Sequence, residues 1–106
     1  MVSYEEIRLL SDQIVQQFHP EKIILFGSYA YGKPVLSSDV DLLIVMPYDL
    51  HPAYQAAAIR ASLKPPFPVD LIVRDPAELA QRIALGDWFL RDIMQHGQVL
   101  YASSHG

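Results

Sequence analysis

The strongest constraint on the fold is a pair of apolar runs that each begin near aspartate. The first run reads Asp39-Val40-Asp41-Leu42-Leu43-Ile44-Val45, and the second reads Val69-Asp70-Leu71-Ile72-Val73. Both have the length and the apolar, β-branched composition of a β-strand. Side chains alternate across a strand, so Asp39 and Asp41 share one face, where their like charges repel each other. A sheet that contains this sequence has to accommodate carboxylates at the starts of its strands.

A divalent cation between the carboxylates would turn this repulsion into attraction. Hard oxygen ligands of this kind suit Mg²⁺ or Mn²⁺. If the two runs form neighbouring strands, Asp70 joins Asp39 and Asp41, and three carboxylates can hold two metal ions about 4 Å apart for phosphoryl displacement. Each aspartate alone is explained more simply as a solvated residue at a strand end. The three together, each at a strand start, predict a metal-binding and catalytic cluster.

The remaining sequence alternates between helix and strand signals. Ser3 and Glu6 have the spacing of a capping box, and Asp75-Pro76 marks a later helix start. The expected elements are a helix from Ser3 to Phe18, a strand Lys22–Phe26, one helical turn Ser28–Tyr31, a strand Asp39–Met46, a helix His51–Leu63, a strand Val69–Val73, a helix from Pro76 to about Leu85, a helix Trp88–His96 and a segment Val99–Tyr101 that either pairs as a strand or simply packs. This order predicts one α+β domain over residues 1–106, with a small mixed β-sheet and helices mainly on one face.

Gly27-Ser28 follows the first expected strand directly. Glycine permits a tight turn and a close approach of the backbone to another group. Ser28 can cap the turn that follows, and its hydroxyl and the nearby N–H groups can face a phosphate. A plain strand-to-helix turn with a serine cap explains the pair equally simply. The sequence is not a Walker loop, because the spacing and the Lys-Ser/Thr pair of that motif are missing.

Charge and composition exclude several classes of function. The net charge is −4 and the eight basic residues are scattered, which argues against direct binding of nucleic acid. The chain has no cysteine, so it forms no disulfide and no thiolate metal site. We see no membrane-spanning run and no signal peptide, and we expect a cytoplasmic protein with a frayed tail over Ala102–Gly106.

The motif spacing resembles that of a known superfamily. Gly27-Ser28, ten residues and then Asp39-x-Asp41 match the signature of the DNA polymerase β-like nucleotidyltransferases. The run Phe26–Gly32, continued by Ser38–Val45, resembles the minimal, stand-alone members called MNT proteins. These are commonly paired with a HEPN-domain partner as a toxin–antitoxin system. The resemblance extends from Lys22 to Val73 and implies the polymerase β-like nucleotidyltransferase fold.

The resemblance also implies roles for the matched residues. Residues that match Gly27 and Ser28 hold the nucleotide triphosphate. Residues that match Asp39 and Asp41 bind the metal ions, and the one that matches Asp70 completes the metal site and can accept the proton of the attacking hydroxyl. The implied cofactor is Mg²⁺, as two ions, with Mn²⁺ as a substitute, and the implied substrate is ATP.

The implied activity is transfer of AMP from ATP to a hydroxyl, such as a tyrosine, of a HEPN toxin, which makes the chain an antitoxin. Many family members carry arginine where this chain has Tyr31, a difference that could weaken phosphate binding or shift the nucleotide preference. Two alternatives stay open. The chain could bind and occlude its toxin without catalysis, or it could modify a small molecule with help from a dimer. A homo-oligomer and a hetero-oligomer are both compatible with the sequence.

Other residues that could carry chemistry have simpler explanations. Lys33 and Arg74 lie near the predicted site in the sequence and could neutralise phosphate, but a solvated surface position explains each more simply. Trp88 and Phe89 are more typical of a core or an interface than of a base-stacking platform. Surface or cap positions are expected for the histidines, which are His19, His51, His96 and His105.

Overall fold

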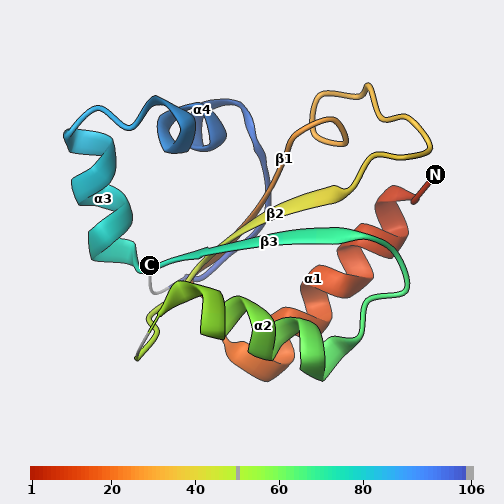
Figure 1. The fold of residues 1–106 in the computed structure, drawn as a ribbon, viewed down its shortest axis with the longest axis horizontal. Helices are drawn as coiled ribbons and strands as arrows, with labels where there is room; N and C mark the ends of the chain where they lie inside the picture. Colours follow the sequence, from red (N-terminus) through yellow and green to blue (C-terminus); the bar gives the residue numbers. More distant parts are fainter. Residues whose placement is uncertain (50, 105–106) are drawn as a thin grey trace.

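The computed structural model describes residues 1–49 and 51–104, so Leu50, His105 and Gly106 lie outside it. The last two of these belong to the expected tail, whose end is therefore outside the described residues. Four helices and four strands are found in this described part of the chain (Figure 1). In chain order they are α1 (Tyr4–Phe18), β1 (Lys22–Phe26), β2 (Val40–Val45), α2 (Pro52–Leu63), β3 (Val69–Arg74), α3 (Pro76–Ala84), α4 (Trp88–His96) and β4 (Gln98–Ala102).

The helix ends follow from local side-chain chemistry. Ser3 and Glu6 form the predicted capping box, because the Ser3 hydroxyl accepts the Glu6 N–H at 3.1 Å and the Glu6 carboxylate accepts the Ser3 N–H at 3.1 Å. Asp75 caps α3 by accepting the N–H of Ala77 at 2.9 Å, and Pro76 occupies the first helical turn. These caps satisfy N–H groups that have no partner inside a helix.

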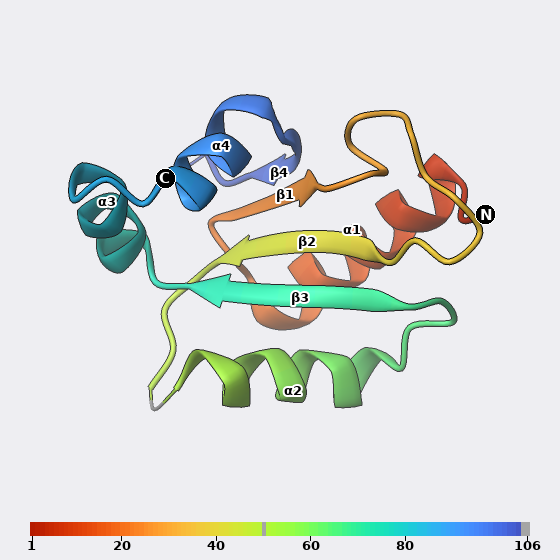
Figure 2. The ribbon, with the colours of Figure 1, turned by 45° about the horizontal axis from the view of Figure 1, so that its top comes forward.

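The sheet is mixed, with the strand order β3-β2-β1-β4. β1 pairs antiparallel with both β2 and β4, whereas β2 and β3 run parallel. A parallel pair needs a crossover connection, and α2 provides it between β2 and β3. The expected final segment therefore pairs as a strand, at the edge next to β1. Figure 2 shows β1, β2 and β3 side by side, with α2 alongside β3.

Helices cover both faces of the sheet. The larger core cluster joins α1 and α2 to one face through residues that include Ile14, Ile23 and Ile44, and the smaller cluster joins α3 and α4 to the other face through residues that include Ile24, Leu43 and Ile93. The expected α+β class and mixed sheet are confirmed. We expected the helices mainly on one face, but two lie on each face. The reason is that β1 and β2 are apolar on both sides, so each side has to be shielded from water.

No helix in the described residues is long and apolar enough to cross a bilayer. The longest, α1, has 15 residues and exposes charged side chains along one side.

The helices and strands begin and end within about two residues of the positions expected from sequence, which is the usual difference between assignments of element ends.

Candidate active site

The sheet register places Asp41 and Asp70 side by side. β2 and β3 run parallel, and Asp41 is the register partner of Asp70. Partners on neighbouring strands point to the same face, and the strands lie about 4.8 Å apart. Asp39 precedes β2 directly and lies two residues before Asp41. Asp41 and Asp70 therefore lie side by side at the start of β2 and β3, on the face that carries α3 and α4, and Asp39 lies just before this end of β2.

Asp41 is the central carboxylate of the three. Its side chain is half-buried, whereas Asp39 and Asp70 are exposed. Burial, then the negative charge of Asp70, then that of Asp39 raise the pKa of Asp41 from 3.8 to about 6. Both neighbours are thus close enough to act on Asp41 through charge.

The three carboxylates do not form a ready-made coordination sphere. Over residues 1–49 and 51–104, no group of three or more His, Asp or Glu side chains is arranged closely enough to hold a metal ion. After burial, the charges of Asp70 and Asp39 still contribute to the raised pKa of Asp41. Carboxylates repel one another, and a positive charge between them would reduce this repulsion.

We predict that Asp41→Asn stabilises the metal-free protein near neutral pH. The folded-state pKa of Asp41, about 6, lies above its ordinary value of 3.8, so the folded protein binds this proton more tightly than the unfolded chain. The stability of the wild type therefore falls as pH rises through this window, and the full penalty is present above it. Asparagine removes the charge and keeps the size of the side chain. With solvent screening taken into account, we expect a Tm about 4 °C higher, which corresponds to about 1 kcal/mol.

Thermal unfolding followed by circular dichroism in EDTA tests this prediction across pH. The difference in Tm between Asp41→Asn and wild type should shrink as the pH is lowered from 6, and it should vanish only at about pH 3, well below the unfolded-state pKa of 3.8, where the carboxyl is protonated in both states. A variant that is less stable than wild type at neutral pH would contradict the charge argument.

Gly27 makes room for the Asp41 carboxylate. Its φ is 74°, in the left-handed region that favours glycine. A Cβ placed on Gly27 would lie 2.1 Å from Oδ2 of Asp41, closer than any side chain tolerates. The close approach of the backbone that the sequence predicted at Gly27-Ser28 is therefore present, and it brings this turn against the central carboxylate.

After Gly27 the chain forms a tight turn rather than a helix. The N–H groups of Ala30 and Tyr31 both donate to the Gly27 carbonyl, at 3.0 and 3.2 Å. The expected helical turn is thus present as a hydrogen-bonded turn, which we call the Gly27–Gly32 turn. Within the described part of the chain, neither the hydroxyl nor the N–H of Ser28 has a hydrogen-bond partner. Both remain available as donors.

Three successive residues of the Gly27–Gly32 turn are tied to distant parts of the chain. Val2 N donates to the Tyr29 hydroxyl at 3.1 Å, Gln98 Nε2 donates to the Ala30 carbonyl at 2.8 Å, and the Tyr31 hydroxyl donates to Asp92 Oδ2 at 3.1 Å. Partial burial, the hydrogen bond and the charge of Asp92 raise the pKa of Tyr31 above its ordinary value, so its hydroxyl stays a donor. Sequence reasoning missed Asp92 and Gln98, because their partners lie 61 and 68 residues away and no local pattern marks them.

The two cations considered in the sequence have different positions. Lys33 directly follows the turn, its N–H donates to the Ser28 carbonyl at 3.0 Å, and it is exposed. Arg74 pairs in register with Val45, at the opposite end of β3 from Asp70. Its guanidinium donates to the Val73 carbonyl at 2.8 Å. Lys33 is therefore near the carboxylate end of the sheet in the structure, and Arg74 is not.

The histidines in the described residues occupy cap or surface positions, as expected. His19 ends α1 in a left-handed conformation, and His51 caps the start of α2. His96 lies at the end of α4, where its Nδ1 is 2.9 Å from Oδ1 of Asp92. His105 lies outside the described residues.

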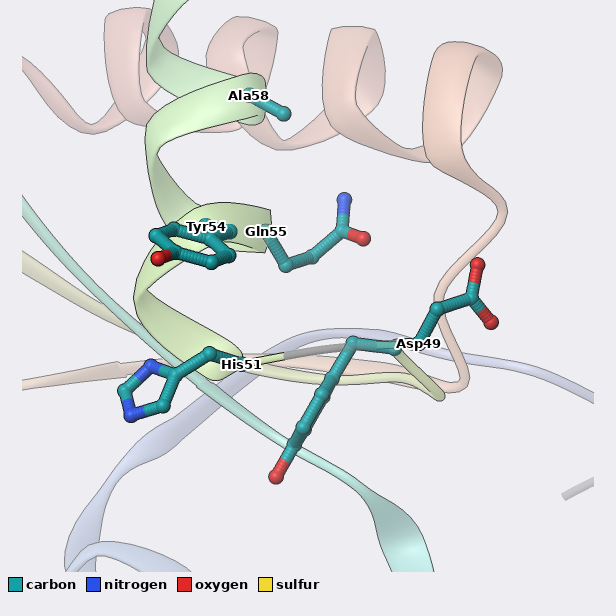
Figure 3. Close-up of a pocket in the computed structure, with 6 residues that line it drawn as sticks. Asp49, His51, Tyr54, Gln55 and Ala58 are labelled. Atoms are coloured by element: carbon teal, nitrogen blue, oxygen red, sulfur yellow. The ribbon is translucent and has the colours of Figure 1, made fainter.

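A surface pocket lies at the other end of β2 from the carboxylates. Figure 3 shows residues that line it, which are Tyr48, Asp49, His51, Tyr54, Gln55 and Ala58. They follow the end of β2 or belong to the first turns of α2, whereas Asp39 and Asp41 stand at the start of β2. In Figure 3 the carboxylate of Asp49 points away from the rings of His51 and Tyr54. This pocket is therefore separate from the carboxylate cluster.

Comparison with known proteins gives similarities in sequence and in fold. A family model described as "Nucleotidyltransferase domain" matches residues 7–100. A protein of Methanocaldococcus jannaschii named "Putative protein adenylyltransferase" is 35% identical over 82 residues, which cover 76% of this chain and 78% of the relative.

Two solved structures have a similar fold. A toxin–antitoxin structure with AMP-PNP has a TM-score of 0.58 at 20% identity, over 92% of this chain and 75% of that chain. A structure of a toxin–antitoxin MntA–HpeT mutant has a TM-score of 0.55 at 18% identity, over 98% of this chain and 77% of that chain. The family match spans all four strands but the end of β4, and it includes the three carboxylates and the Gly27–Gly32 turn. The chain belongs to the nucleotidyltransferase domain family, and it is a nucleotidyltransferase.

Proposed function

We propose that this chain transfers AMP from ATP to a tyrosine hydroxyl of a partner HEPN toxin, and that it thereby acts as an antitoxin. The observation that carries the proposal is that Asp41 lies beside Asp70 at one end of the sheet, with Asp39 just before β2, and that a glycine turn with unused donors lies against Asp41. In this proposal residues 1–106 work as one domain. The use of ATP and the lack of cysteine fit a cytoplasmic location.

The names of similar proteins support the adenylyl donor and the kind of acceptor. The relative from Methanocaldococcus jannaschii carries the name of a protein adenylyltransferase. The similar solved structures are of toxin–antitoxin systems, and one of them contains AMP-PNP, an analogue of ATP. These names describe those proteins, and we extend them to this chain because the sequence similarity includes the carboxylates and the turn.

The carboxylates fit a divalent cation such as Mg²⁺. They supply hard oxygen ligands, and Gly27 leaves open the space that a side chain would otherwise fill. Burial, then the charges of Asp70 and Asp39, raise the pKa of Asp41, so a cation beside it would be favoured. We propose Asp39, Asp41 and Asp70 as the ligands of two such ions. When bound, Mg²⁺ would neutralise phosphate charge and polarise the phosphoryl group.

The protein's own residues would bind the nucleotide and move one proton. The N–H and hydroxyl of Ser28 donate to phosphate oxygens, and Gly27 allows the turn to lie against Asp41. Asp70, which is exposed, accepts the proton of the acceptor hydroxyl. The acceptor oxygen then forms a bond to the α-phosphorus, the bond from that phosphorus to the bridging oxygen breaks, and pyrophosphate leaves with the electron pair.

The exposure of the site favours a macromolecular acceptor. Asp39 and Asp70 are both exposed, so this end of the sheet is open to a large acceptor. An acceptor hydroxyl on a partner protein reaches such a site directly, and the partner excludes water as it docks.

Transfer of label from α-labelled ATP to a co-expressed HEPN partner tests the proposal. We expect a labelled partner in the presence of Mg²⁺, with the label on a tyrosine and lost in the Asp39→Ala plus Asp41→Ala variant. Failure to label an authentic partner, or label that persists in the double variant, would refute the catalytic proposal. If the double variant still rescues cells from the toxin and the toxin carries no label, the chain acts by occlusion without catalysis.

We also predict that Mn²⁺ with ATP raises the Tm of the wild type. A ligand at ten times its Kd stabilises the folded state by about 1.4 kcal/mol, which is roughly 6–10 °C for a domain of this size. Differential scanning fluorimetry should show this rise for the wild type and for Asp49→Asn, whose carboxylate lies at the other end of β2. It should be lost in Asp39→Asn plus Asp41→Asn. An equal rise in the double variant would place the cation elsewhere.

A further inference from the structure

We infer that Asp92 on α4 and Gln98 on β4 are positioning residues that hold the Gly27–Gly32 turn in the place required for nucleotide binding. Asp92 acts through Tyr31, and Gln98 acts through the carbonyl of Ala30. The inference rests on the proposed function, in which Gly27 and Ser28 contact the nucleotide phosphates.

The Gly27–Gly32 turn depends on side chains for its position. It lies in the connection between β1 and β2, outside the hydrogen-bond ladder of the sheet. In the described residues, the hydrogen bonds that join residues 27–39 to the rest of the chain are those at Tyr29, Ala30 and Tyr31. Two of these three come from the segment that begins with α4. Loss of either would leave the turn freer to move relative to the sheet.

α4 is itself fixed against the end of β1. The ring of Phe89 packs edge-on against Phe26, with ring centroids 5.9 Å apart, and Phe26 is the register partner of Asp41. One turn along α4, Asp92 accepts the Tyr31 hydroxyl with Oδ2, while its Oδ1 lies 2.9 Å from His96 Nδ1. The carboxylate of Asp92 is therefore held from both sides, which gives the Tyr31 hydroxyl a fixed acceptor.

Gln98 holds the neighbouring residue from a different element. It pairs in register with Leu25 at the start of β4, and its side chain reaches the Ala30 carbonyl at 2.8 Å. A displacement of Ala30 or Tyr31 would be transmitted to Gly27, because both residues donate their N–H groups to its carbonyl. The position of the Ser28 donors, which bind the phosphates in the proposed site, relative to the Asp41 carboxylate is thus set partly by Asp92 and Gln98.

Kinetics with Mg²⁺-ATP and the labelled acceptor test this role through Tyr31→Phe, Asp92→Leu and Asp92→Asn. We expect the KM for ATP to rise about tenfold in Tyr31→Phe and in Asp92→Leu, with kcat changed less than about twofold, because the contact orders the binding turn and not the reacting atoms. Asp92→Asn keeps an acceptor for the Tyr31 hydroxyl and should retain most of the affinity. The Tyr31→Phe plus Asp92→Leu double variant should resemble either single variant, since both remove one contact.

Tyr54→Phe is the matched control, since Tyr54 is an exposed tyrosine on α2 and should keep the KM of the wild type. Equal KM values in wild type, Tyr31→Phe and Asp92→Leu would overturn the inference. A fall in kcat alone, or additive effects in the double variant, would also overturn it.

Amide hydrogen exchange separates this inference from the proposed function. The N–H groups of Ala30 and Tyr31 should exchange about tenfold faster in Asp92→Leu and Gln98→Ala than in wild type, without added nucleotide. If wild-type protein binds no ATP by calorimetry yet exchange accelerates in these variants, the proposed function fails and the turn is still held as described. If ATP binds and neither exchange nor affinity changes in the variants, the positioning role fails and the proposed function stands.

Discussion

Replacing Asp41 with asparagine should reduce AMP transfer by about a thousandfold or more and leave the fold intact. Asp41 is the central, half-buried carboxylate, and Asp39 and Asp70 both act on it through charge. In the proposed site it contributes to holding cations that are worth several kcal/mol in a phosphoryl-transfer reaction, and several kcal/mol corresponds to this loss of rate. Initial rates with α-labelled ATP and the partner protein, measured at saturating Mg²⁺, give the size of the effect.

Two controls separate lost chemistry from lost structure. Asp49→Asn changes the same residue type at the other end of β2 and should keep the wild-type rate. The Tm of Asp41→Asn in EDTA should be higher than that of the wild type, so the inactive variant is expected to be the more stable protein. Activity within tenfold of the wild type would show that Asp41 does not belong to the catalytic cluster.

Replacing Gly27 with alanine should lower activity by about a hundredfold and also lower stability. The backbone at Gly27 has φ 74°, which costs an alanine about 1–2 kcal/mol. The new methyl group would also lie 2.1 Å from Oδ2 of Asp41, so either the carboxylate or the turn has to move. A displacement of about 1 Å at a reacting centre is sufficient for a loss of this size. Steady-state kinetics and thermal unfolding measure the two effects.

Gly32→Ala provides the matched control for this substitution. Gly32 has φ 76°, nearly the same as Gly27, but a Cβ at this position would meet no atom within 4 Å. Both alanine variants should therefore show a similar backbone penalty in Tm, and only Gly27→Ala should show the large loss of activity. Equal losses of activity in the two variants would mean that backbone strain, and not contact with Asp41, explains the need for glycine.

The position of Asp70 beside Asp41 could be predicted from sequence because it follows from strand periodicity. Side chains two residues apart on a strand point to the same face of the sheet. Because each apolar run has an aspartate near its start, Asp70 lies beside Asp41 once the two strands are neighbours. The parallel direction of β2 and β3 depends on the crossover through α2, which the helix signal at 51–63 already indicated. The local chemistry of Ser3, Glu6 and Asp75 likewise fixed the helix starts.

The surroundings of the turn could not be predicted in the same way. The contacts of Tyr31 with Asp92 and of Ala30 with Gln98 depend on how α4 and β4 pack, and tertiary packing leaves no local signature in a sequence. The distribution of helices over the two faces has a similar origin. Ile24 and Leu43 require cover just as Ile23 and Ile44 do, but the sequence does not state which helix supplies it.

The position of β1 between β2 and β4 has a consequence for synthesis on the ribosome. β1 is translated before β2, α2, β3, α3 and α4, yet its second neighbour, β4, is translated only after all of these. Until then one edge of this apolar strand has unpaired backbone groups, a state that favours aggregation. A nascent chain can pair β2 with β3 before β4 exists, but it can complete the four-stranded sheet only after β4 has been translated.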